Sequence, residues 1–271
     1  MSIRVDQALV ERGLCESREK AKRAVMAGTV KINEHPARKP SDTVKPDDQL
    51  TLLVPEKFVS RGGFKLEHAL AHFHISPAGQ TAIDLGASTG GFTDCLLQHG
   101  ATKVFAVDVG QGQLAWKLRR DSRIVVMEKT NARALKPANF PAPADLIVID
   151  CSFISLQKIL PAAVALLRPS GKIIALLKPQ FEAGKAEVDK GAGVITDPAI
   201  HERVQRELEQ FVGSFEFPVS GFELKTNATP GLKNSKPETR NSKLVWRGVT
   251  ESPLLGPAGN KEFLVLIEKT N

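Results

Sequence analysis

The sequence predicts an α/β protein in two parts, a small α+β domain followed by a larger, doubly wound parallel sheet with helices. From residue 81 to residue 177, short apolar runs alternate with amphipathic segments, which is typical of the strand–helix repeats of a parallel sheet. The N-terminal residues show another pattern, two short helical segments followed by two short strands. We therefore expect one domain over residues 1–57, a linker over 58–63 and a second domain over 64–271.

The composition indicates a folded protein with an anionic partner. With 271 residues, of which 42% are hydrophobic and 25% charged, the chain has room for a large domain and a small one. The formal net charge of +7 favours a nucleic-acid partner, although many basic enzymes bind none. No apolar run approaches the roughly 20 residues of a membrane span, and charges interrupt the apolar N-terminal segment. We expect neither a membrane span, nor a signal peptide, nor stable membrane association.

Cysteine usage indicates a reducing compartment, the cytoplasm. The chain has three cysteines, Cys15, Cys95 and Cys151, an odd number at distant positions. This spacing fits neither a disulfide framework nor a zinc cluster, so we expect no metal.

The first 57 residues are expected to contain two helices, Arg4–Arg12 and Arg18–Met26, and two strands, Val30–Asn33 and Gln49–Val54. Ser17 is a suitable N-cap for the second helix, which is crowded with basic residues. Acidic residues also occur here, so a solvated helix face remains the alternative to RNA binding. The candidate RNA contacts are Arg4, Arg18, Lys20, Lys22 and Arg23.

The stretch Thr81–Thr93 predicts the ligand site of the second domain, because an apolar strand leads into a glycine-rich loop and then a helix. Its spacing, G-x-x-x-G-G, lacks the G-x-G-x-x-G of dinucleotide sites and the Gly-Lys ending of phosphate loops. A ligand without pyrophosphate needs no phosphate cradle, which favours S-adenosyl-L-methionine over NAD. Asp108 ends the second strand, where a carboxylate binds ribose hydroxyls, and Asn131 follows the third, near the expected adenine. The candidate cofactor-binding residues are Asp84, Gly86, Ser88, Gly90, Phe92, Asp108 and Asn131.

Two further strands place charged residues at the same edge of the sheet. Residues 145–150 are apolar on both faces and end in Asp150, and residues 172–177 deliver Lys178. Because open α/β sheets bind ligands beyond the carboxyl ends of their strands, both side chains should lie beside the cofactor. Cys151 is disfavoured as a nucleophile, since no histidine lies in the neighbouring motifs to activate it.

The C-terminal part is expected to hold a loop over 187–194, a helix from about 196 to 212 and strands over 215–222 and 262–267. Residues 225–243 are rich in Lys, Asn, Thr, Ser and Pro, and we expect a mobile cationic loop there.

Motifs in both parts resemble known families. Residues 4–13, 17–21 and 26–33 are similar to the αL RNA-binding domain, which is named after a small-subunit ribosomal protein and carries basic residues on two helices. The motifs at 84–93, 107–110, 148–153 and 177–182 resemble the FtsJ-like class of ribose 2′-O-methyltransferases, which have a Rossmann-like fold. Together with the junction at 60–63, these motifs are similar to the TlyA (hemolysin A) family, which implies ribosomal RNA or ribosomal subunits as partner and the 2′-hydroxyl of cytidine as target.

The resemblance also implies a Lys-Asp-Lys-Glu tetrad. By motif position its members are Lys65, Asp150, Lys178 and Glu262, with Glu251 and Glu268 nearby as less suitable candidates for the last. Lys178 would take the hydroxyl proton or stabilise the developing alkoxide. Arg61 in the junction is a further expected RNA contact.

Three other functions remain as alternatives. A non-catalytic RNA-binding protein could retain the same fold. A membrane-lytic protein is disfavoured by the lack of a convincing lytic amphipathic helix. A nucleotide-dependent oxidoreductase is disfavoured by the missing G-x-G-x-x-G.

Overall fold

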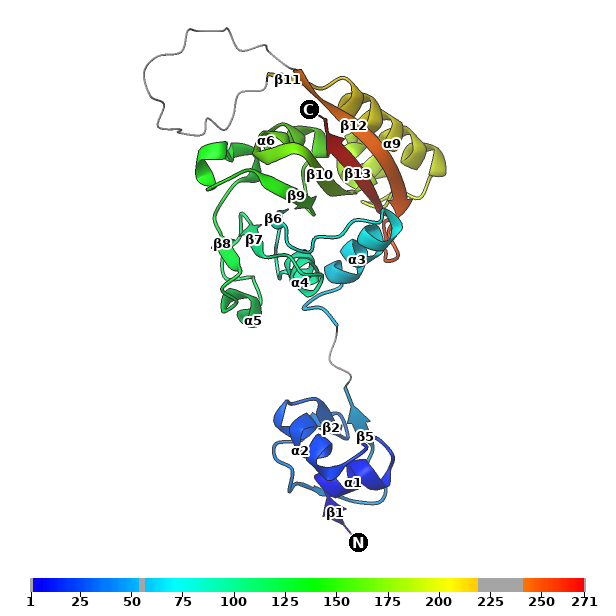
Figure 1. Cartoon of the computed structure of the whole chain (residues 1–271). Helices are drawn as coiled ribbons and strands as arrows, with labels where there is room; N and C mark the ends of the chain where they lie inside the picture. Colours follow the sequence, from blue (N-terminus) through cyan, green and yellow to red (C-terminus); the bar gives the residue numbers. More distant parts are fainter. Residues whose placement is uncertain (1, 54–56, 219–240, 271) are drawn as a thin grey trace, which may run out of the picture. The chain divides into compact units, whose positions relative to one another are not determined.

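The computed structural model describes residues 2–53, 57–218 and 241–270. The chain divides between Lys57 and Phe58 into two compact units, each with its own core (Figure 1). Phe58 is 1% exposed and packs in the core of the second unit, and helix α3 (Gly62–His72) already begins at Gly62. Residues 58–63, which we expected to form a linker, are therefore part of the second unit.

The first unit packs the two predicted helices against short strands, of which those near residues 30–33 and 49–54 were predicted and three two-residue strands were not. Ser17 caps α2 by accepting a hydrogen bond at 3.3 Å from the Lys20 N–H. Val5, Leu9 and Val25 form part of a buried core between the helices. The elements described in this unit are β1 (Ile3–Arg4), α1 (Val5–Glu11), α2 (Arg18–Met26), β2 (Val30–Ile32), β3 (His35–Pro36), β4 (Thr43–Val44) and β5 (Leu50–Leu52).

The described residues of the second unit form an eight-stranded sheet in the order β11-β12-β13-β10-β9-β6-β7-β8. The strands from β10 to β8 are parallel, and β11, β12 and β13 join antiparallel. The chain order reverses between β6 and β9, which is where such sheets bind ligands. The strands are β6 (Thr81–Leu85), β7 (Lys103–Val107), β8 (Ile124–Met127), β9 (Ala144–Ile149), β10 (Leu167–Leu177), β11 (Glu216–Pro218), β12 (Asn241–Glu251) and β13 (Phe263–Lys269).

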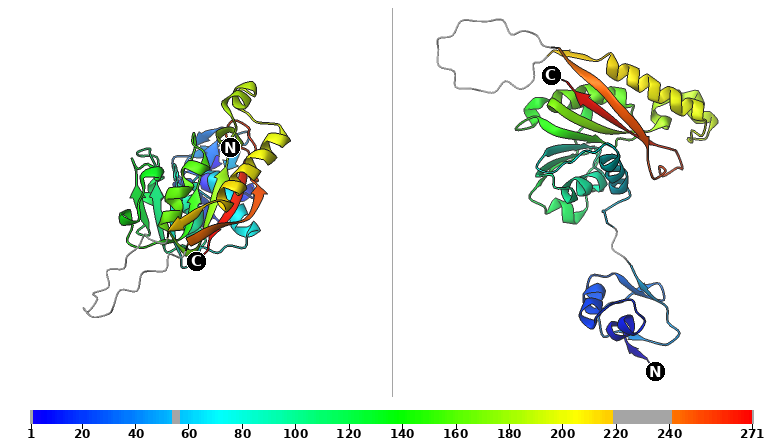
Figure 2. Two further views of the ribbon diagram at one scale, coloured as in Figure 1. Left: turned by 90° about the horizontal axis from the view of Figure 1, so that it is seen from above. Right: turned by 45° about the vertical axis from the view of Figure 1, so that its right-hand side comes forward.

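Helices cover both faces of this sheet because alternate strand residues point to opposite sides. On one face, Ile147 and Ile149 of β9 belong to the same cluster as α6 (Leu160–Leu166) and α9 (Pro198–Gly213). On the other, Leu146 and Val148 belong to the cluster of α3, α4 (Gly91–Gln98) and α5 (Trp116–Arg119). Each fully buried aliphatic side chain contributes about 1.5–3 kcal/mol. Both views of Figure 2 show α9 running beside β12.

The shorter elements of the second unit lie at or near the ends of the strands. They are η1 (Ala132–Ala134), η2 (Pro137–Asn139), η3 (Leu156–Lys158), α7 (Pro179–Glu182) and α8 (Lys185–Lys190).

Two segments differ from the expected secondary structure. The expected loop over 187–194 begins as helix α8, because Glu187 accepts the Gly184 N–H at 3.0 Å and pairs with Arg203 of α9 at 2.6 Å. Residues 241–243, expected in a loop, begin the long strand β12 and pair there with β11, a contact that no local pattern reveals. Residues 219–222 of the expected strand and 225–240 of the expected loop lie outside the described residues.

Within the described ranges, no helix combines the length and the apolar character needed to cross a membrane.

Candidate active site

The loop after β6 follows a path that requires glycine at two positions. Gly86 has a φ of +90°, and a Cβ there would lie 2.5 Å from the carbonyl oxygen of Asp150. Gly90 has a φ of +96°, and its Cβ would lie 2.3 Å from Leu118 Cδ1. L side chains rarely adopt such φ values. These two glycines therefore let the loop approach the end of β9 and helix α5 closely.

Beyond this loop lies a cavity of about 440 Å³, which we call the loop cavity. It opens at the carboxyl ends of β6, β7 and β9, where the strand order reverses. Its lining includes five predicted site residues: Gly86, Ser88, Asp108, Asn131 and Asp150. Asp84, Gly90 and Phe92, also expected to bind the cofactor, are not among its lining residues.

Asp108 holds the loop cavity in shape. Its carboxylate accepts the Ser88 N–H at 2.8 Å and the Gly110 N–H at 2.7 Å, one on each oxygen. Each oxygen retains a lone pair for a further donor, such as a ribose hydroxyl. The geometry is thus suited to the role predicted for Asp108.

Asp84 is a buried acid behind the loop rather than an exposed ligand group. It is 0% exposed, and its Oδ2 accepts a hydrogen bond from the Thr93 hydroxyl at 2.7 Å. Its Oδ1 is buried without a hydrogen-bond partner among the described residues. Burial raises the pKa of Asp84 to about 7, and the charge of Asp150 contributes to this rise.

This buried acid predicts a pH dependence of stability. Because the folded state binds the Asp84 proton more tightly, stability falls as pH rises through the range between the unfolded pKa of 3.8 and the folded pKa of about 7. The free energy of unfolding of Asp84→Asn minus that of the wild type should therefore increase by about 4 kcal/mol as the pH rises from roughly 3 to roughly 8. Denaturant unfolding of both proteins without cofactor measures this change, and a difference that does not vary with pH would contradict it.

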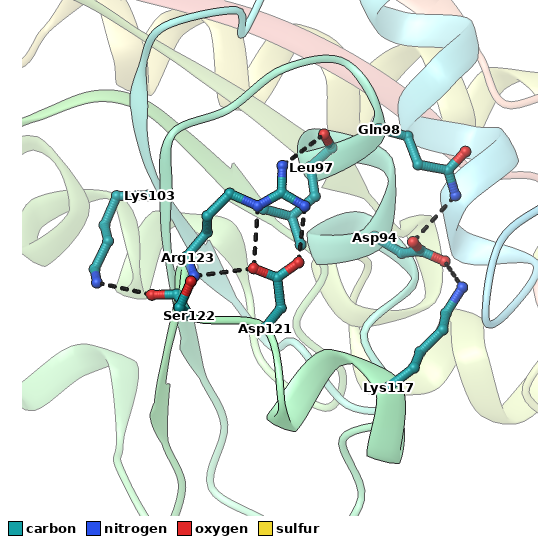
Figure 3. A network of polar contacts seen from close by, with 8 residues as sticks. All are labelled: Asp94, Leu97, Gln98, Lys103, Lys117, Asp121, Ser122 and Arg123. Atoms are coloured by element: carbon teal, nitrogen blue, oxygen red, sulfur yellow. Dashed lines mark hydrogen bonds and ion pairs between the residues drawn. The ribbon is translucent and has the colours of Figure 1, made fainter.

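A polar network ties α5 to α4 next to the glycine loop (Figure 3). Lys117 of α5 pairs with Asp94 of α4 at 3.0 Å, and Asp94 also accepts the Val59 N–H at 2.9 Å. After α5, Arg123 donates two side-chain hydrogen bonds and one backbone hydrogen bond to Asp121, and these lower the pKa of that carboxyl to about 2. These contacts hold in place the helix that packs against Gly90.

Strand pairing brings three predicted catalytic residues together. Leu177 of β10 pairs with Phe263 of β13, so Lys178 and Glu262 lie next to each other where β10 ends and β13 begins. On the other side of β10, Lys178 Nζ lies 2.7 Å from Asp150 Oδ1 and donates to Ser152 Oγ at 2.9 Å.

The fourth predicted residue, Lys65, reaches this edge from α3. Its ammonium forms a hydrogen-bonded ion pair with Glu262, and the two side chains are 9% and 1% exposed. The tetrad thus consists of two ion pairs, Lys65–Glu262 and Lys178–Asp150. The other two candidate glutamates pair elsewhere, Glu251 with Lys261 and Glu268 with Arg247.

A second cavity of about 700 Å³ lies over Lys178 and Glu262, and we call it the lysine cavity. It shares Ser152, Phe153 and Ile154 with the loop cavity. Two ligands could therefore meet beside the Lys178–Asp150 pair, one in each cavity.

Buried Asn260 fixes one wall of the lysine cavity. Its side-chain oxygen accepts the Ile195 N–H at 2.8 Å, and its nitrogen donates to the Gly193 carbonyl at 3.0 Å. Asn260 is 1% exposed and lies two residues before Glu262. It joins the segment after α8 to the turn before β13, and no local sequence signal indicated this role.

Sequence reasoning also missed two aromatic residues at the cavities. Phe153 lines both cavities, is 90% exposed and has a φ of +62°, and its ring lies 5.1 Å from that of Phe181. Phe153 lies three residues after Asp150, and Phe181 lies three residues after Lys178. This shared spacing is the signal that could have indicated them.

Cys151 has the properties of a structural thiol. Burial raises its pKa to about 12, and the charge of Asp150 adds to this effect. Its Sγ donates to the Leu85 carbonyl at 3.4 Å. A thiol that stays protonated is a poor nucleophile, in line with the sequence-based interpretation.

The predicted RNA contacts are distributed over both units. Arg4 and Arg18 both contact the buried carboxylate of Asp6, at 3.0 and 3.4 Å, while their own side chains are 44% and 53% exposed. In the second unit, Arg61 donates to the Leu255 carbonyl at 2.9 Å. The remaining candidates are exposed or partly exposed on α2: Lys20, Lys22 and Arg23.

No group of three or more His, Cys, Asp or Glu side chains that could hold a metal ion occurs in the part of the chain that the structure describes.

Residues 58–220 match the FtsJ-like methyltransferase family, and residues 3–50 match the S4 domain. The 16S/23S rRNA (cytidine-2′-O)-methyltransferase TlyA of Mycobacterium tuberculosis is 42% identical over 266 residues, which cover 97% of this chain and 88% of that protein. The chain belongs to the TlyA family of FtsJ-like methyltransferases. The resemblance inferred from the sequence motifs is thereby confirmed.

Two further relatives carry the hemolysin name. Hemolysin A of Brachyspira hyodysenteriae is 42% identical over 203 residues, 74% of this TlyA-family chain and 84% of that protein. A solved structure named "Putative hemolysin from Streptococcus thermophilus" superimposes with a TM-score of 0.68 at 40% identity and covers 100% of this chain and 89% of the other. This superposition and the S4-domain match confirm the predicted α/β fold with a small N-terminal domain of the RNA-binding type.

Proposed function

We propose that this TlyA-family methyltransferase transfers the methyl group of S-adenosyl-L-methionine to the ribose 2′-hydroxyl of a cytidine in ribosomal RNA. The observation that carries the proposal is the Lys178–Asp150 ion pair between two adjoining cavities. The 42% identical relative from Mycobacterium tuberculosis, which bears this activity in its name, supports the choice of substrate. A ribosomal substrate also implies a cytoplasmic location.

The loop cavity suits the cofactor. At Gly86 a Cβ would collide with the Asp150 carbonyl, so only a bare backbone can line the cavity there. Asp108 would bind the ribose hydroxyls, and Asn131 would contact the adenine. When bound, S-adenosylmethionine supplies an electrophilic methyl carbon, and the other groups of the reaction come from the RNA and this chain.

The tetrad acts on the hydroxyl that attacks this carbon. Lys178 takes the hydroxyl proton as a base or, in its charged form, stabilises the developing alkoxide. Asp150 and the Ser152 hydroxyl orient the Lys178 ammonium through contacts of 2.7 and 2.9 Å. The Lys65–Glu262 pair lies next to Lys178 and positions the ribose. Alignment of the two reacting atoms contributes much of the rate.

The target nucleotide has to leave its stack to reach Lys178. Phe153, 90% exposed on the rim of both cavities, offers a surface on which an unstacked base can rest. The S4 domain, with Arg4, Arg18, Lys20, Lys22 and Arg23, supplies affinity for structured RNA through phosphate contacts.

Asp108→Asn should weaken cofactor binding by about 10- to 100-fold, because one carboxylate oxygen that holds the loop and faces the ribose becomes an amide. Calorimetric titration with S-adenosylmethionine measures the dissociation constant. Asp121→Asn is the matched control, since Asp121 pairs with Arg123 outside the cavity. Equal affinities for the two variants would remove Asp108 from the cofactor site.

Transfer of a labelled methyl group to ribosomal subunits tests the proposed function directly. Subunits from cells lacking this gene are incubated with the protein and labelled S-adenosylmethionine, and the RNA is then hydrolysed with alkali. Label in an alkali-resistant dinucleotide with cytidine at its 5′ position supports the proposal. Label on a base would overturn the 2′-hydroxyl as target. Binding of RNA and cofactor without any transfer would support a non-catalytic RNA-binding protein instead.

A further inference from the structure

One buried polar atom of the lysine cavity has no hydrogen-bond partner among the described residues. Gln180 is the second residue of α7 and lines this cavity. Its Oε1 is buried, and no described residue donates a hydrogen bond to it. Unpaired buried carbonyl oxygens are costly and rare in native proteins, so each one calls for a ligand or another explanation.

The backbone around Gln180 is held firmly. The Phe181 N–H donates to the Lys178 carbonyl at 2.9 Å, and the Ala183 N–H donates to the Pro179 carbonyl at 2.8 Å. This short turn places Gln180 two residues beyond the proposed catalytic lysine. With the backbone held in this way, a rotation of the Gln180 side chain is enough to bring its buried amide oxygen to a substrate.

Three other polar side chains of the cavity already have partners. Lys178 pairs with Asp150 and Ser152, Glu262 pairs with Lys65, and Asn260 bonds to two backbone groups. The Phe153 and Phe181 rings supply an apolar surface beside Gln180. An aromatic surface with an unpaired amide next to it is the combination by which proteins hold and read an unstacked base.

We propose that Gln180 determines base specificity by reading the pairing edge of the target base, an inference that rests on the proposed 2′-O-methylation. Cytosine offers a donor at its exocyclic N4 amine and an acceptor at N3. The Gln180 Oε1 accepts from N4, and Nε2 donates to N3. Uracil presents the reverse pattern, an acceptor at O4 and a donor at N3, so an amide in the orientation that bonds to cytosine places acceptor against acceptor and donor against donor.

The test is a cycle of two enzymes and two substrates. After the methylated position has been mapped with the wild type, subunits are prepared with cytidine or uridine at that position. Initial rates of 2′-O-methylation are measured for the wild type and for Gln180→Met, which keeps the length of the side chain but has no amide. One good bidentate pair discriminates by about 1–3 kcal/mol, or about 5- to 150-fold. The wild type should prefer cytidine by such a factor.

Gln180→Met should methylate cytidine more slowly than the wild type by about this factor and uridine at nearly the wild-type rate. It should therefore show almost no preference between the two substrates. An unchanged preference in Gln180→Met would overturn the proposal, as would equal losses on both substrates in a variant that still folds and binds cofactor. Gln205→Met on α9, away from both cavities, is the matched control. Gln180→Glu, which keeps the acceptor but loses the donor, should show an intermediate preference and replaces the methionine variant if that one fails to fold.

The outcome is distinguishable from failure of the proposed function. If the wild type produces no 2′-O-methylated nucleotide at all, the proposed reaction itself is wrong. If it methylates cytidine and uridine equally well, the reaction stands and base reading by Gln180 is wrong.

Discussion

Lys178→Met is expected to lower the rate of methyl transfer by about 10²- to 10⁴-fold, the range usually lost with a positioned acid–base group. Methionine fills a similar volume but can neither accept the hydroxyl proton nor stabilise an alkoxide. The loop cavity does not include Lys178, so affinity for S-adenosylmethionine should change little. Single-turnover transfer of labelled methyl groups to ribosomal subunits measures the rate, and calorimetric titration measures the affinity.

Lys172→Met is the matched control for this variant. Lys172 lies on the same strand, β10, five residues before Leu177 and toward the end of the strand that is remote from both cavities. Its replacement should leave the rate within about twofold of the wild type, as expected for a substitution away from the site. If Lys178→Met retains the wild-type rate, Lys178 has no catalytic role and another group must act on the hydroxyl.

The second large effect is expected at the Lys65–Glu262 pair. Both side chains are nearly inaccessible, at 9% and 1% exposed, so removing one charge leaves the other buried without compensation. Glu262→Gln should therefore lower the free energy of unfolding by about 3–5 kcal/mol and also reduce methyl transfer. Chemical denaturation monitored by circular dichroism gives the first quantity, and the methyl-transfer assay gives the second.

A double variant separates stability from catalysis. Lys65→Met combined with Glu262→Leu removes both charges at similar volume, and such replacements are often neutral or stabilising. We expect it to recover most of the lost stability while methyl transfer remains low. Recovery of methyl transfer together with stability would indicate that the pair only supports the fold.

The sequence by itself determined the main elements and one edge of the site. The helices of the first unit were predictable because their signals are local, such as Ser17 at the start of α2. The glycine loop was predictable because its backbone needs positive φ values at Gly86 and Gly90. Few residues other than glycine adopt such values, so the loop leaves a recognisable glycine pattern in the sequence. Asp150 and Lys178 could be placed together because the carboxyl ends of parallel strands meet at one edge.

Tertiary structure alone decided the contacts that depend on strand register and distant packing. The sequence could not pair Lys65 with a glutamate 197 positions away, and it left Glu251 and Glu268 as alternatives to Glu262. The register between β10 and β13 decides among these glutamates, because the pairing of Leu177 with Phe263 puts Glu262 beside Lys178.

Dependence on distant segments also explains why β12, α8 and the buried amide groups could not be predicted from the sequence. Strand β12 is defined by its partner β13, and α8 is anchored by Arg203 of another helix. Asp84 resembled a ligand residue in the sequence, yet the fold buries it behind the loop. Local patterns encode turns, caps and strand ends, whereas which side chains end up buried, paired or unpaired, as with Asn260 and Gln180, depends on segments that meet only in the folded chain.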